Sequence, residues 1–376
     1  MSWQAGMRLA GAGVALAVLT AGCSAPRDAA AERAAPIAVR THATGAFAAG
    51  THAARSGVMP VRPAGARAQR ASARPARGRP ARRATPPRTA RTPPGGAWRT
   101  RDARRARPRF RPRLGVYAKG MPRSYRPVRK FGAAVRKRPA IVLFYSGIGE
   151  HFPAGFAAQA HAHRALPLDQ INPTGVSIAQ IAAGRYDAYL RSYADEIRAY
   201  RHRVIIGFAH EMNGSWYPWG WTHVSPRTWV RAWRHVVRIF RRRGADNVTW
   251  LWTVSRVLSQ GPMRSYWPGA GYVNWVGIDG YYSRRRDTFR TVFVPALRVV
   301  RQFTDKPVLV SESAIGQRAG QARRIPNLLA GILRHHLRGL VWFDVRQQGG
   351  LSRQDWRLEG HRRALAAFRA ADRGFR

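Results

Sequence analysis

Residues 204–220 read VIIGFAHEMNGSWYPWG, which is a short apolar run, rich in β-branched residues, that ends at Glu211 among aromatic side chains. Residues 307–316, PVLVSESAIG, repeat this arrangement, because a second apolar run there ends at Glu312. Both runs have the length and composition of buried β-strands. We therefore expect two strands of one parallel sheet, each with a glutamate at its carboxyl end.

Further apolar runs alternate with segments of helical periodicity, of which 186–200, 228–243 and 325–336 are examples. Such alternation is typical of parallel strands joined by crossover helices. The eight expected strands cover 114–118, 140–145, 166–171, 204–209, 248–253, 275–279, 308–311 and 340–344. Their number and the chain length predict a single (β/α)8 TIM barrel with both glutamates at its carboxyl-terminal rim. The alternative, an open doubly wound sheet, is disfavoured because no glycine-rich phosphate loop follows the first strand.

Composition divides the chain at about residue 113, because Ala, Arg, Pro and Gly dominate the preceding part. Apolar runs and most of the tryptophans and tyrosines follow Leu114. A segment such as RPRFRPR, residues 107–113, cannot bury a core, and repulsion between its arginines favours an extended chain. We expect a disordered basic linker over 23–113 and a single (β/α)8 domain over 114–376.

The first 22 residues are typical of an export signal peptide, since Arg8 precedes an apolar run that is shorter than the roughly 20 residues of a membrane-spanning helix. Residues 19–23, LTAGC, resemble the bacterial lipobox, which implies lipidation of Cys23. We expect an exported protein anchored to the cell-surface membrane by this lipid, or else a secreted protein if Cys23 is unmodified. Because Cys23 is the single cysteine, an intramolecular disulfide is excluded.

The formal net charge of +48 comes almost entirely from arginine. A linker of this charge is attracted to anionic cell-wall polymers and phospholipid headgroups, which are expected partners of the chain. No specific nucleic acid is expected, because aromatic residues are not interleaved with the arginines of the linker.

Two carboxyl groups at one barrel rim are the requirement for glycosidic bond hydrolysis, in which one donates a proton and the other attacks or supports the anomeric carbon. In a retaining enzyme the two groups lie about 5–5.5 Å apart. Glu211 and Glu312 are the candidates for this pair, and a polysaccharide is the expected substrate. Neither His161 and His163 nor His335 and His336 have carboxylates or cysteines at useful spacing, so the sequence predicts no metal and no cofactor.

The motif HEMNGSW at 210–216, followed by Trp219 and Gly220, resembles the acid/base motif of glycoside hydrolase family 26, a family of β-mannanase-like enzymes. That family belongs to a clan of retaining (β/α)8 barrel glycosidases with catalytic glutamates after strands four and seven. The resemblance implies Glu211 as acid/base, Glu312 as nucleophile and endo-1,4-β-mannosidase activity. The residues after Glu312 depart from the family pattern, because Ser313 and Ala314 replace its common Phe-Gly.

Six further residues are candidates for substrate binding or support. Trp216, Trp219 and Trp342 offer flat apolar faces that suit the C–H surfaces of sugar rings. His210 is expected to contact the substrate or the nucleophile, and Asn213 to brace the loop. The resemblance also implies that a tyrosine after the sixth strand, for which Tyr281 fits best, donates a hydrogen bond to the nucleophile.

Two other functions stay open from the sequence. A β-glucanase or a β-xylanase of the same fold would use the same pair of glutamates, because the side chains that distinguish the sugars are dispersed over the loops. A non-catalytic carbohydrate-binding protein of the cell surface would keep the barrel but would not hydrolyse any glycan.

Overall fold

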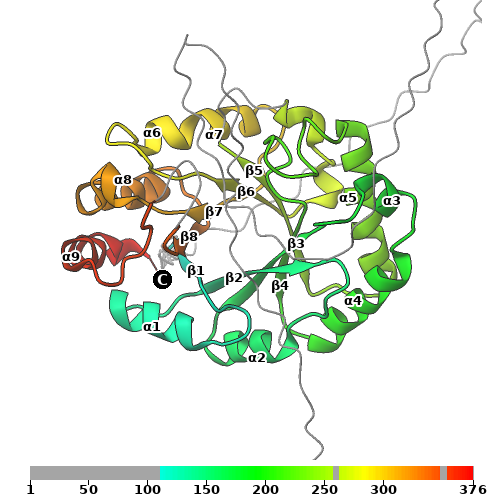
Figure 1. Ribbon diagram of the computed structural model, residues 1–376, viewed down its shortest axis with the longest axis horizontal. Coiled ribbons are helices and arrows are strands. Elements are labelled where there is room, and N and C mark those ends of the chain that lie inside the picture. The colour runs from blue at the N-terminus through cyan, green and yellow to red at the C-terminus, as the bar shows by residue number, and fades with distance from the viewer. Residues whose placement is uncertain (1–110, 257–261, 348–353, 376) are drawn as a thin grey trace, which may run out of the picture. The chain divides into compact units, whose positions relative to one another are not determined.

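The computed structural model describes residues 111–256, 262–347 and 354–375, and these form a closed barrel of eight parallel strands (Figure 1). Neighbouring strands follow chain order, and β1 pairs with β8 to close the ring. The strands are β1 (Arg113–Ala118), β2 (Ile141–Gly147), β3 (Leu166–Asn172), β4 (Val204–Phe208), β5 (Val248–Ser255), β6 (Trp275–Asp279), β7 (Val308–Ser313) and β8 (Gly339–Asp344). The predicted barrel is confirmed, and closure between the first and last strands excludes an open doubly wound sheet.

Helices surround the strands, as Figure 1 shows. The α-helices are α1 (Arg126–Val135), α2 (Ala154–Ala162), α3 (Ile178–Ala182), α4 (Asp187–Tyr200), α5 (Pro226–Arg242), α6 (Phe289–Val292), α7 (Val294–Arg301), α8 (Gln321–Arg334) and α9 (Arg362–Ala371). Short 3-10 helices are η1 (Met263–Tyr266), η2 (Ala270–Tyr272), η3 (Gln317–Ala319) and η4 (Asp372–Gly374). Each pair of consecutive strands is thus joined by a crossover that returns the chain to the same end of the barrel.

Helix α5 shows why these segments are helical and how they pack. Its amino terminus is capped by Ser225, whose side chain accepts a hydrogen bond from Thr228 N, and Pro226 occupies the first turn, where its missing N–H has no helical partner to lose. Apolar residues recur at helical spacing and are buried, while the arginines between them form the other face. The buried set includes Trp229, Trp233, Val236, Val237 and Phe240.

The core has two parts, one inside the barrel and one between the strands and the helices. The inner part is small and consists of Ile141, Leu143, Leu168, Ile205, Leu251, Trp275, Leu309 and Val341. The outer part is larger and takes the alternate residues of the same strands together with the apolar faces of the helices. Because both faces of each strand are covered, the strands are recognisable as nearly continuous apolar runs.

Toward the carboxyl-terminal ends of the strands, the barrel interior becomes polar. Two glycines leave the space that these polar side chains occupy. A Cβ atom at Gly207 would lie 1.9 Å from Oε1 of Gln170, and one at Gly277 would lie 2.4 Å from Oγ1 of Thr253. Gln170 Nε2 donates to Thr253 Oγ1 at 3.1 Å, and both side chains are buried. The glycines therefore give space to a polar layer beneath the carboxyl-terminal ends of the strands.

Several predictions concern residues 1–110, which lie outside the described residues. These are the signal peptide over 1–22, lipidation of Cys23 and nearly all of the linker over 23–113. Strand β1 begins at Arg113, one residue before the expected start of the barrel. Among the described residues, no helix has the length and apolar character needed to cross a membrane.

Candidate active site

Glu211 lies in the loop that follows β4 at the carboxyl-terminal rim. The backbone takes positive φ angles of 46° at Ala209 and 53° at Glu211, which side chains with a Cβ adopt at a cost of about 1–3 kcal/mol each. Glu211 N donates to Thr253 O of β5 at 2.9 Å, and Gly214 N donates to Glu211 O at 2.8 Å. Backbone hydrogen bonds on both sides thus hold Glu211 in this conformation.

Two further contacts brace the same loop. Asn213 Nδ2 donates to Ser255 O at 3.1 Å, and Ser255 N donates to Asn213 Oδ1 at 2.9 Å, so the amide side chain pairs with the end of β5 in both directions. Trp219 Nε1 donates to His210 O at 2.7 Å. These contacts fix the loop against the end of β5.

The two candidate tryptophans of this loop differ in their surroundings. Trp216 is half-buried, and its Nε1 donates to Glu211 Oε2 at 2.9 Å. Trp219 is buried, with its ring stacked on Tyr217 at a centroid distance of 4.5 Å. Trp216 is therefore partly exposed beside Glu211, whereas Trp219 holds the loop together and is too buried to stack on a sugar.

Glu312 lies in β7, where the pairing register with β6 and β8 shifts. Tyr281, two residues after β6, donates its hydroxyl to Glu312 Oε2 at 2.7 Å, which is the contact implied by the family resemblance. Tyr145 of β2 donates to Glu312 Oε1 at 2.5 Å, a contact that the sequence did not indicate. Both carboxylate oxygens of Glu312 therefore accept a hydrogen bond from a phenol.

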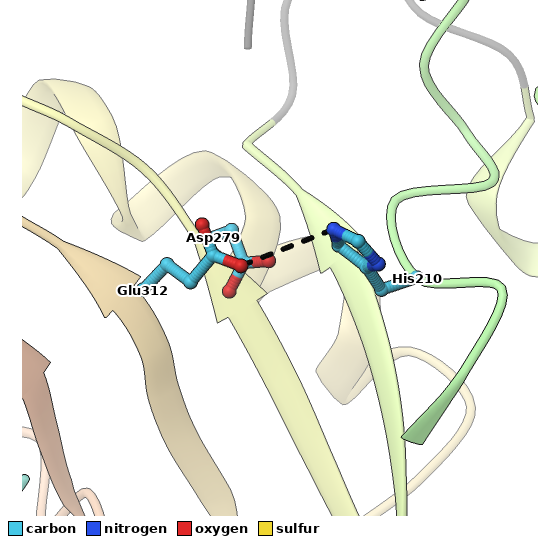
Figure 2. A group of neighbouring side chains, drawn as sticks. All are labelled: His210, Asp279 and Glu312. Atoms are coloured by element: carbon cyan, nitrogen blue, oxygen red, sulfur yellow. Dashed lines mark ion pairs between the residues drawn. The ribbon is translucent and has the colours of Figure 1, made fainter. Parts of the chain in front are cut away.

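His210 and Asp279 complete the polar group around Glu312 (Figure 2). His210 Nδ1 lies 2.9 Å from Oδ1 of Asn172, which assigns the ring proton to Nδ1, and its Nε2 lies 3.9 Å from Glu312 Oε1. That distance is too long for a hydrogen bond. Asp279, at the end of β6, accepts a hydrogen bond at Oδ1 from Ser311 Oγ at 2.5 Å.

Burial shifts the pKa values of all four titratable groups. Burial and then the charge of Glu312 raise the pKa of Glu211 to about 8, although donors at Trp216 and Ser255 oppose this rise. Burial also raises the pKa of Glu312 to about 7, and the two phenols oppose it. Burial lowers the pKa of His210 to about 3, so the imidazole is neutral and forms no ion pair with Glu312. Burial, followed by the charges of Glu312 and Glu211, raises the pKa of Asp279 well above its usual range.

These shifts give the two glutamates different protonation states near neutral pH. Glu211 has the higher pKa and keeps its proton, while Glu312 loses its proton first because the phenols stabilise its ionised form. Pairs of carboxyl groups separated in this way are the arrangement in which one acts as acid and the other as nucleophile.

His210, Asp279 and Glu312 also have the spacing of a metal-binding group, because one ligand atom of each lies within 4.8 Å of the others (Figure 2). A metal would need Asp279 ionised, and burial opposes this. It would also compete with the hydrogen bonds from Ser311 to Asp279 and from Tyr145 to Glu312. Burial of Asp279 and the hydroxyl donors already on both carboxyl groups therefore disfavour a cation at this position.

Trp342 lies outside this group. Its side chain is fully buried, packs edge-on against Phe368 of α9 at 5.6 Å and donates from Nε1 to Trp356 O at 3.0 Å. It occupies the layer between barrel and helices, a position that does not fit the predicted contact with substrate. Two other aromatic residues of this region, Trp356 and Phe343, pack on Tyr281 at ring-centroid distances of 5.1 Å and 5.8 Å.

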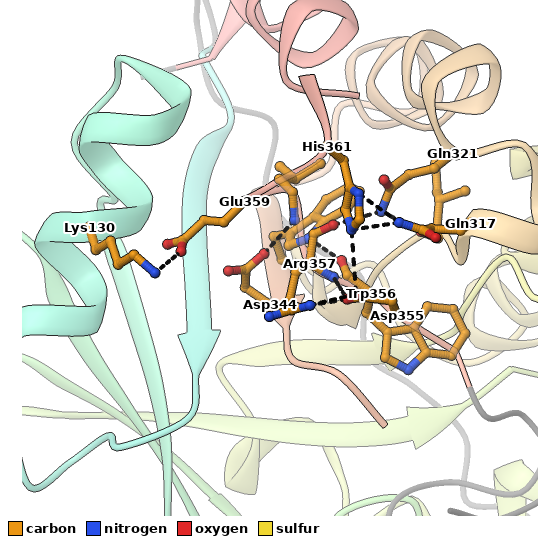
Figure 3. Close-up of polar contacts among 12 residues, drawn as sticks. Lys130, Gln317, Gln321, Asp344, Asp355, Trp356, Arg357, Glu359 and His361 are labelled. Atoms are coloured by element: carbon orange, nitrogen blue, oxygen red, sulfur yellow. Dashed lines mark hydrogen bonds and ion pairs between the residues drawn. The ribbon is translucent and has the colours of Figure 1, made fainter. Parts of the chain in front are cut away.

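Polar contacts fix the segment that carries Trp356, as Figure 3 shows. Asp344 Oδ1 accepts a hydrogen bond from Leu358 N at 2.8 Å, and Gln321 Nε2 donates to Arg357 O at 3.0 Å. Lys130 of α1 forms an ion pair with Glu359 of the same segment. Sequence reasoning missed Trp356 because it follows β8 by twelve residues and no periodicity connects it to the barrel.

Comparison with known proteins relates this site to one family. The sequence model described as Glycosyl hydrolase family 26 matches residues 179–309, a stretch that contains Glu211 and ends three residues before Glu312. Endoglucanase H of Acetivibrio thermocellus is 31% identical over 215 residues, which cover 53% of this chain and 23% of that protein. Beta-1,3-xylanase TXYA of a Vibrio species is 26% identical over 201 residues, covering 50% of this chain and 42% of that protein. A mannan endo-1,4-beta-mannosidase of Bacillus subtilis is 28% identical over 109 residues, covering 26% of this chain and 30% of that protein. The chain thus spans less than half of the length of these relatives.

Solved structures share the barrel. The GH26 beta-mannanase of Bacteroides ovatus has a TM-score of 0.54 at 15% identity, covering 70% of this chain and 89% of that chain. The catalytic domain of the GH26 endo-beta-1,4-mannanase of Bacillus sp. JAMB-750 has a TM-score of 0.55 at 15% identity, covering 69% of this chain and 85% of that chain. At this identity the similarity establishes the fold.

Proposed function

We propose that this chain is a member of glycosyl hydrolase family 26 and a retaining, endo-acting glycoside hydrolase of a β-linked polysaccharide, because the model of that family matches residues 179–309 and Endoglucanase H is 31% identical over 215 residues. The observation that carries the proposal is the pairing of Glu211 after β4 with Glu312 in β7. The charge of Glu312 acts on Glu211, and their pKa values differ in the sense that acid and nucleophile require.

In the first step Glu312 attacks the anomeric carbon, the glycosidic C–O bond breaks, and Glu211 gives its proton to the departing oxygen. A covalent glycosyl ester on Glu312 results. In the second step Glu211, now ionised, takes a proton from water, and the hydroxide oxygen displaces Glu312 from the anomeric carbon. Two inversions at the same carbon retain its configuration, and both glutamates return to their initial states.

The surroundings of the pair support this assignment. Trp216 lies beside Glu211 and is partly exposed, which suits stacking against a sugar ring next to the bond that is cleaved. Tyr281 donates to Glu312 and Trp356 packs on Tyr281, so the nucleophile is held from the β6 and β8 sides.

For the substrate we propose β-1,4-mannan, because mannan endo-1,4-beta-mannosidases are among the relatives and Glu211 lies in the family motif. A mixed-linkage β-glucan is the second candidate, which is favoured by the 31% identity to Endoglucanase H over 215 residues. A β-1,3-xylan is the third, because two relatives are named as β-1,3-xylanases.

The test is hydrolysis of these three polysaccharides by the full chain. We expect new reducing ends on one of them, a mixture of oligosaccharide lengths early in the reaction, and β-anomeric products by proton NMR. Glu312→Ala should abolish this activity, and Glu211→Gln should lower it by at least about 10²-fold. If the wild type binds a glycan but hydrolyses none, and Glu312→Ala binds it equally well, a carbohydrate-binding protein replaces the enzyme.

For location we propose export and anchoring through a lipid on Cys23, on the basis of the lipobox-like LTAGC sequence. The arginines between residues 24 and 113 would then bind anionic cell-wall polymers near the membrane. Mass spectrometry of the mature amino terminus tests the lipid. A mature chain that begins before Cys23, or a Cys23 without the expected mass increase, would contradict it.

A further inference from the structure

Each carboxylate oxygen of Glu312 accepts a hydrogen bond from a phenol hydroxyl. One phenol follows β6, and the other belongs to β2. Tyr281 donates to Oε2 at 2.7 Å, and Tyr145 donates to Oε1 at 2.5 Å. We propose that Tyr145 is a positioning residue, which keeps Glu312 ionised and fixes the direction in which it meets the anomeric carbon. This inference rests on the proposed glycoside hydrolase function.

The position of Tyr145 suits a fixed donor. It lies in β2 (Ile141–Gly147), one residue before the buried Ser146, and β2 is paired on both sides in the barrel. Its ring meets Tyr117 edge-on at a centroid distance of 5.1 Å and lies 5.7 Å from His210. The ring is therefore packed on two sides, and its hydroxyl lies against Glu312 Oε1.

Tyr145 also stays protonated over the working range of the site. Burial and the charge of Glu312 raise the pKa of its phenol well above its usual range. The hydroxyl therefore acts as a donor to Glu312 and does not serve as a base.

Glu312 needs more than one donor because burial opposes its charge. The same charge raises the pKa values of the neighbouring Glu211 and Asp279, which therefore keep their protons. An ionised carboxylate in such a site is stable only when hydrogen bonds replace the lost water. His210 does not supply one, because its proton is on Nδ1 and faces Asn172.

The same donor has a use in the second step of the reaction. When water displaces Glu312 from the sugar, the carbon–oxygen bond of the ester breaks and the electron pair stays on the carboxylate. A phenol at the oxygen that regains this charge stabilises the departure. Tyr145 and Tyr281 together provide such a donor for both oxygens, whichever of the two forms the ester.

The test is the Tyr145→Phe variant of the full chain, which keeps the ring and removes only the hydroxyl. Loss of one hydrogen bond to a charged group should move the acid limb of the kcat/KM profile to higher pH by about one to two units. We expect a fall of at least about tenfold in kcat/KM below pH 7, with a smaller change in KM, because only ionised Glu312 attacks. Tyr281→Phe should shift the acid limb in the same direction.

Tyr117→Phe is the matched control, because this neighbouring phenol packs on Tyr145 and, among the described residues, forms no hydrogen bond with Glu312. An acid limb that moves equally in Tyr145→Phe and Tyr117→Phe, or in neither, overturns the role of Tyr145. Infrared titration of the Glu312 carboxylate, identified by its loss in Glu312→Gln, gives a readout without turnover. If the wild type hydrolyses no glycan, the proposed function fails. The role of Tyr145 is still tested in that case, because a higher pKa of Glu312 in Tyr145→Phe supports the hydrogen bond. An unchanged pKa of Glu312 rejects it.

Discussion

Nε1 of Trp216 donates a hydrogen bond of 2.9 Å to Oε2 of Glu211, five residues earlier in the same loop. The bond stabilises the ionised form of Glu211 and so lowers its pKa, in opposition to burial. An acid that must give up its proton during the reaction and take one back later benefits from this balance, because neither form is strongly favoured.

Trp216→Phe should therefore raise the pKa of Glu211 and move the alkaline limb of the kcat/KM profile to higher pH, by about one unit for one hydrogen bond to a charged group. The ring remains available to a sugar. Trp221→Phe is the control, because Trp221 is exposed on the same loop. An alkaline limb that stays in place in Trp216→Phe would show that the indole does not set the pKa of Glu211.

The wild type should show a narrow bell-shaped profile of kcat/KM against pH. Activity should rise with an apparent pKa of about 7 as Glu312 loses its proton and fall with an apparent pKa of about 8 as Glu211 loses its own. Initial rates at low substrate concentration across pH 5–10 measure this profile, with a check that the enzyme is stable at each pH. An optimum below about pH 5 would contradict the burial effect on both carboxyls.

Glu211→Gln tests the acid role directly. On polysaccharide it should lower kcat by about 10²- to 10⁴-fold, the usual contribution of a general acid or base. On an aryl glycoside whose leaving group needs no proton, the first step should survive, so a burst of aryl alcohol should precede a slow steady state. Asp246→Asn, which changes an exposed acid, should behave as wild type in both assays. Equal losses on both substrates would argue against Glu211 as the acid.

The pattern of apolar runs predicted the barrel because each strand is buried on both faces. The same alternation could have placed Trp342 correctly, since its neighbour Val341 points into the barrel and Trp342 must then point to the helices. Tyr145 was within the predicted strand 140–145, but its contact is with a residue 167 positions away. That contact depends on the register of the closed barrel and on the irregularity in β7, which single-sequence patterns do not reveal.

Gly277→Ala tests the polar layer beneath the site. A Cβ atom there would lie 2.4 Å from Thr253 Oγ1 and 2.5 Å from Ser311 Oγ, so the variant should be destabilised by about 1–3 kcal/mol. Gly155→Ala in α2 is the control, because nothing lies within 4 Å of its added Cβ atom, and alanine there should be neutral or stabilising. Chemical denaturation monitored by tryptophan fluorescence compares the two variants, and equal stability would mean that the layer adjusts without cost.

Asp169→Asn tests a buried carboxyl group that takes no part in the proposed reaction. Asp169 of β3 is fully buried, and its Oδ2 accepts a hydrogen bond from Tyr193 of α4 at 2.5 Å. Burial raises its pKa to about 7 in the folded protein, whereas an unfolded chain has a value near 3.9. The folded state therefore binds the proton more tightly, and the contribution of Asp169 to stability is lost as the pH rises from about 4 to about 7.

An asparagine at this position resembles the protonated acid and cannot ionise, so the variant should lack that loss. We expect its free energy of unfolding relative to wild type to increase between pH 4.5 and pH 8, by on the order of a few kcal/mol for three pKa units. Denaturant unfolding at both pH values measures the difference, and the other buried acids cancel because both proteins contain them. If the difference in free energy of unfolding between variant and wild type does not change with pH, burial does not raise the pKa of Asp169. The hydrogen bonds from Tyr193 and Ser146 would then offset the cost of burying its charge.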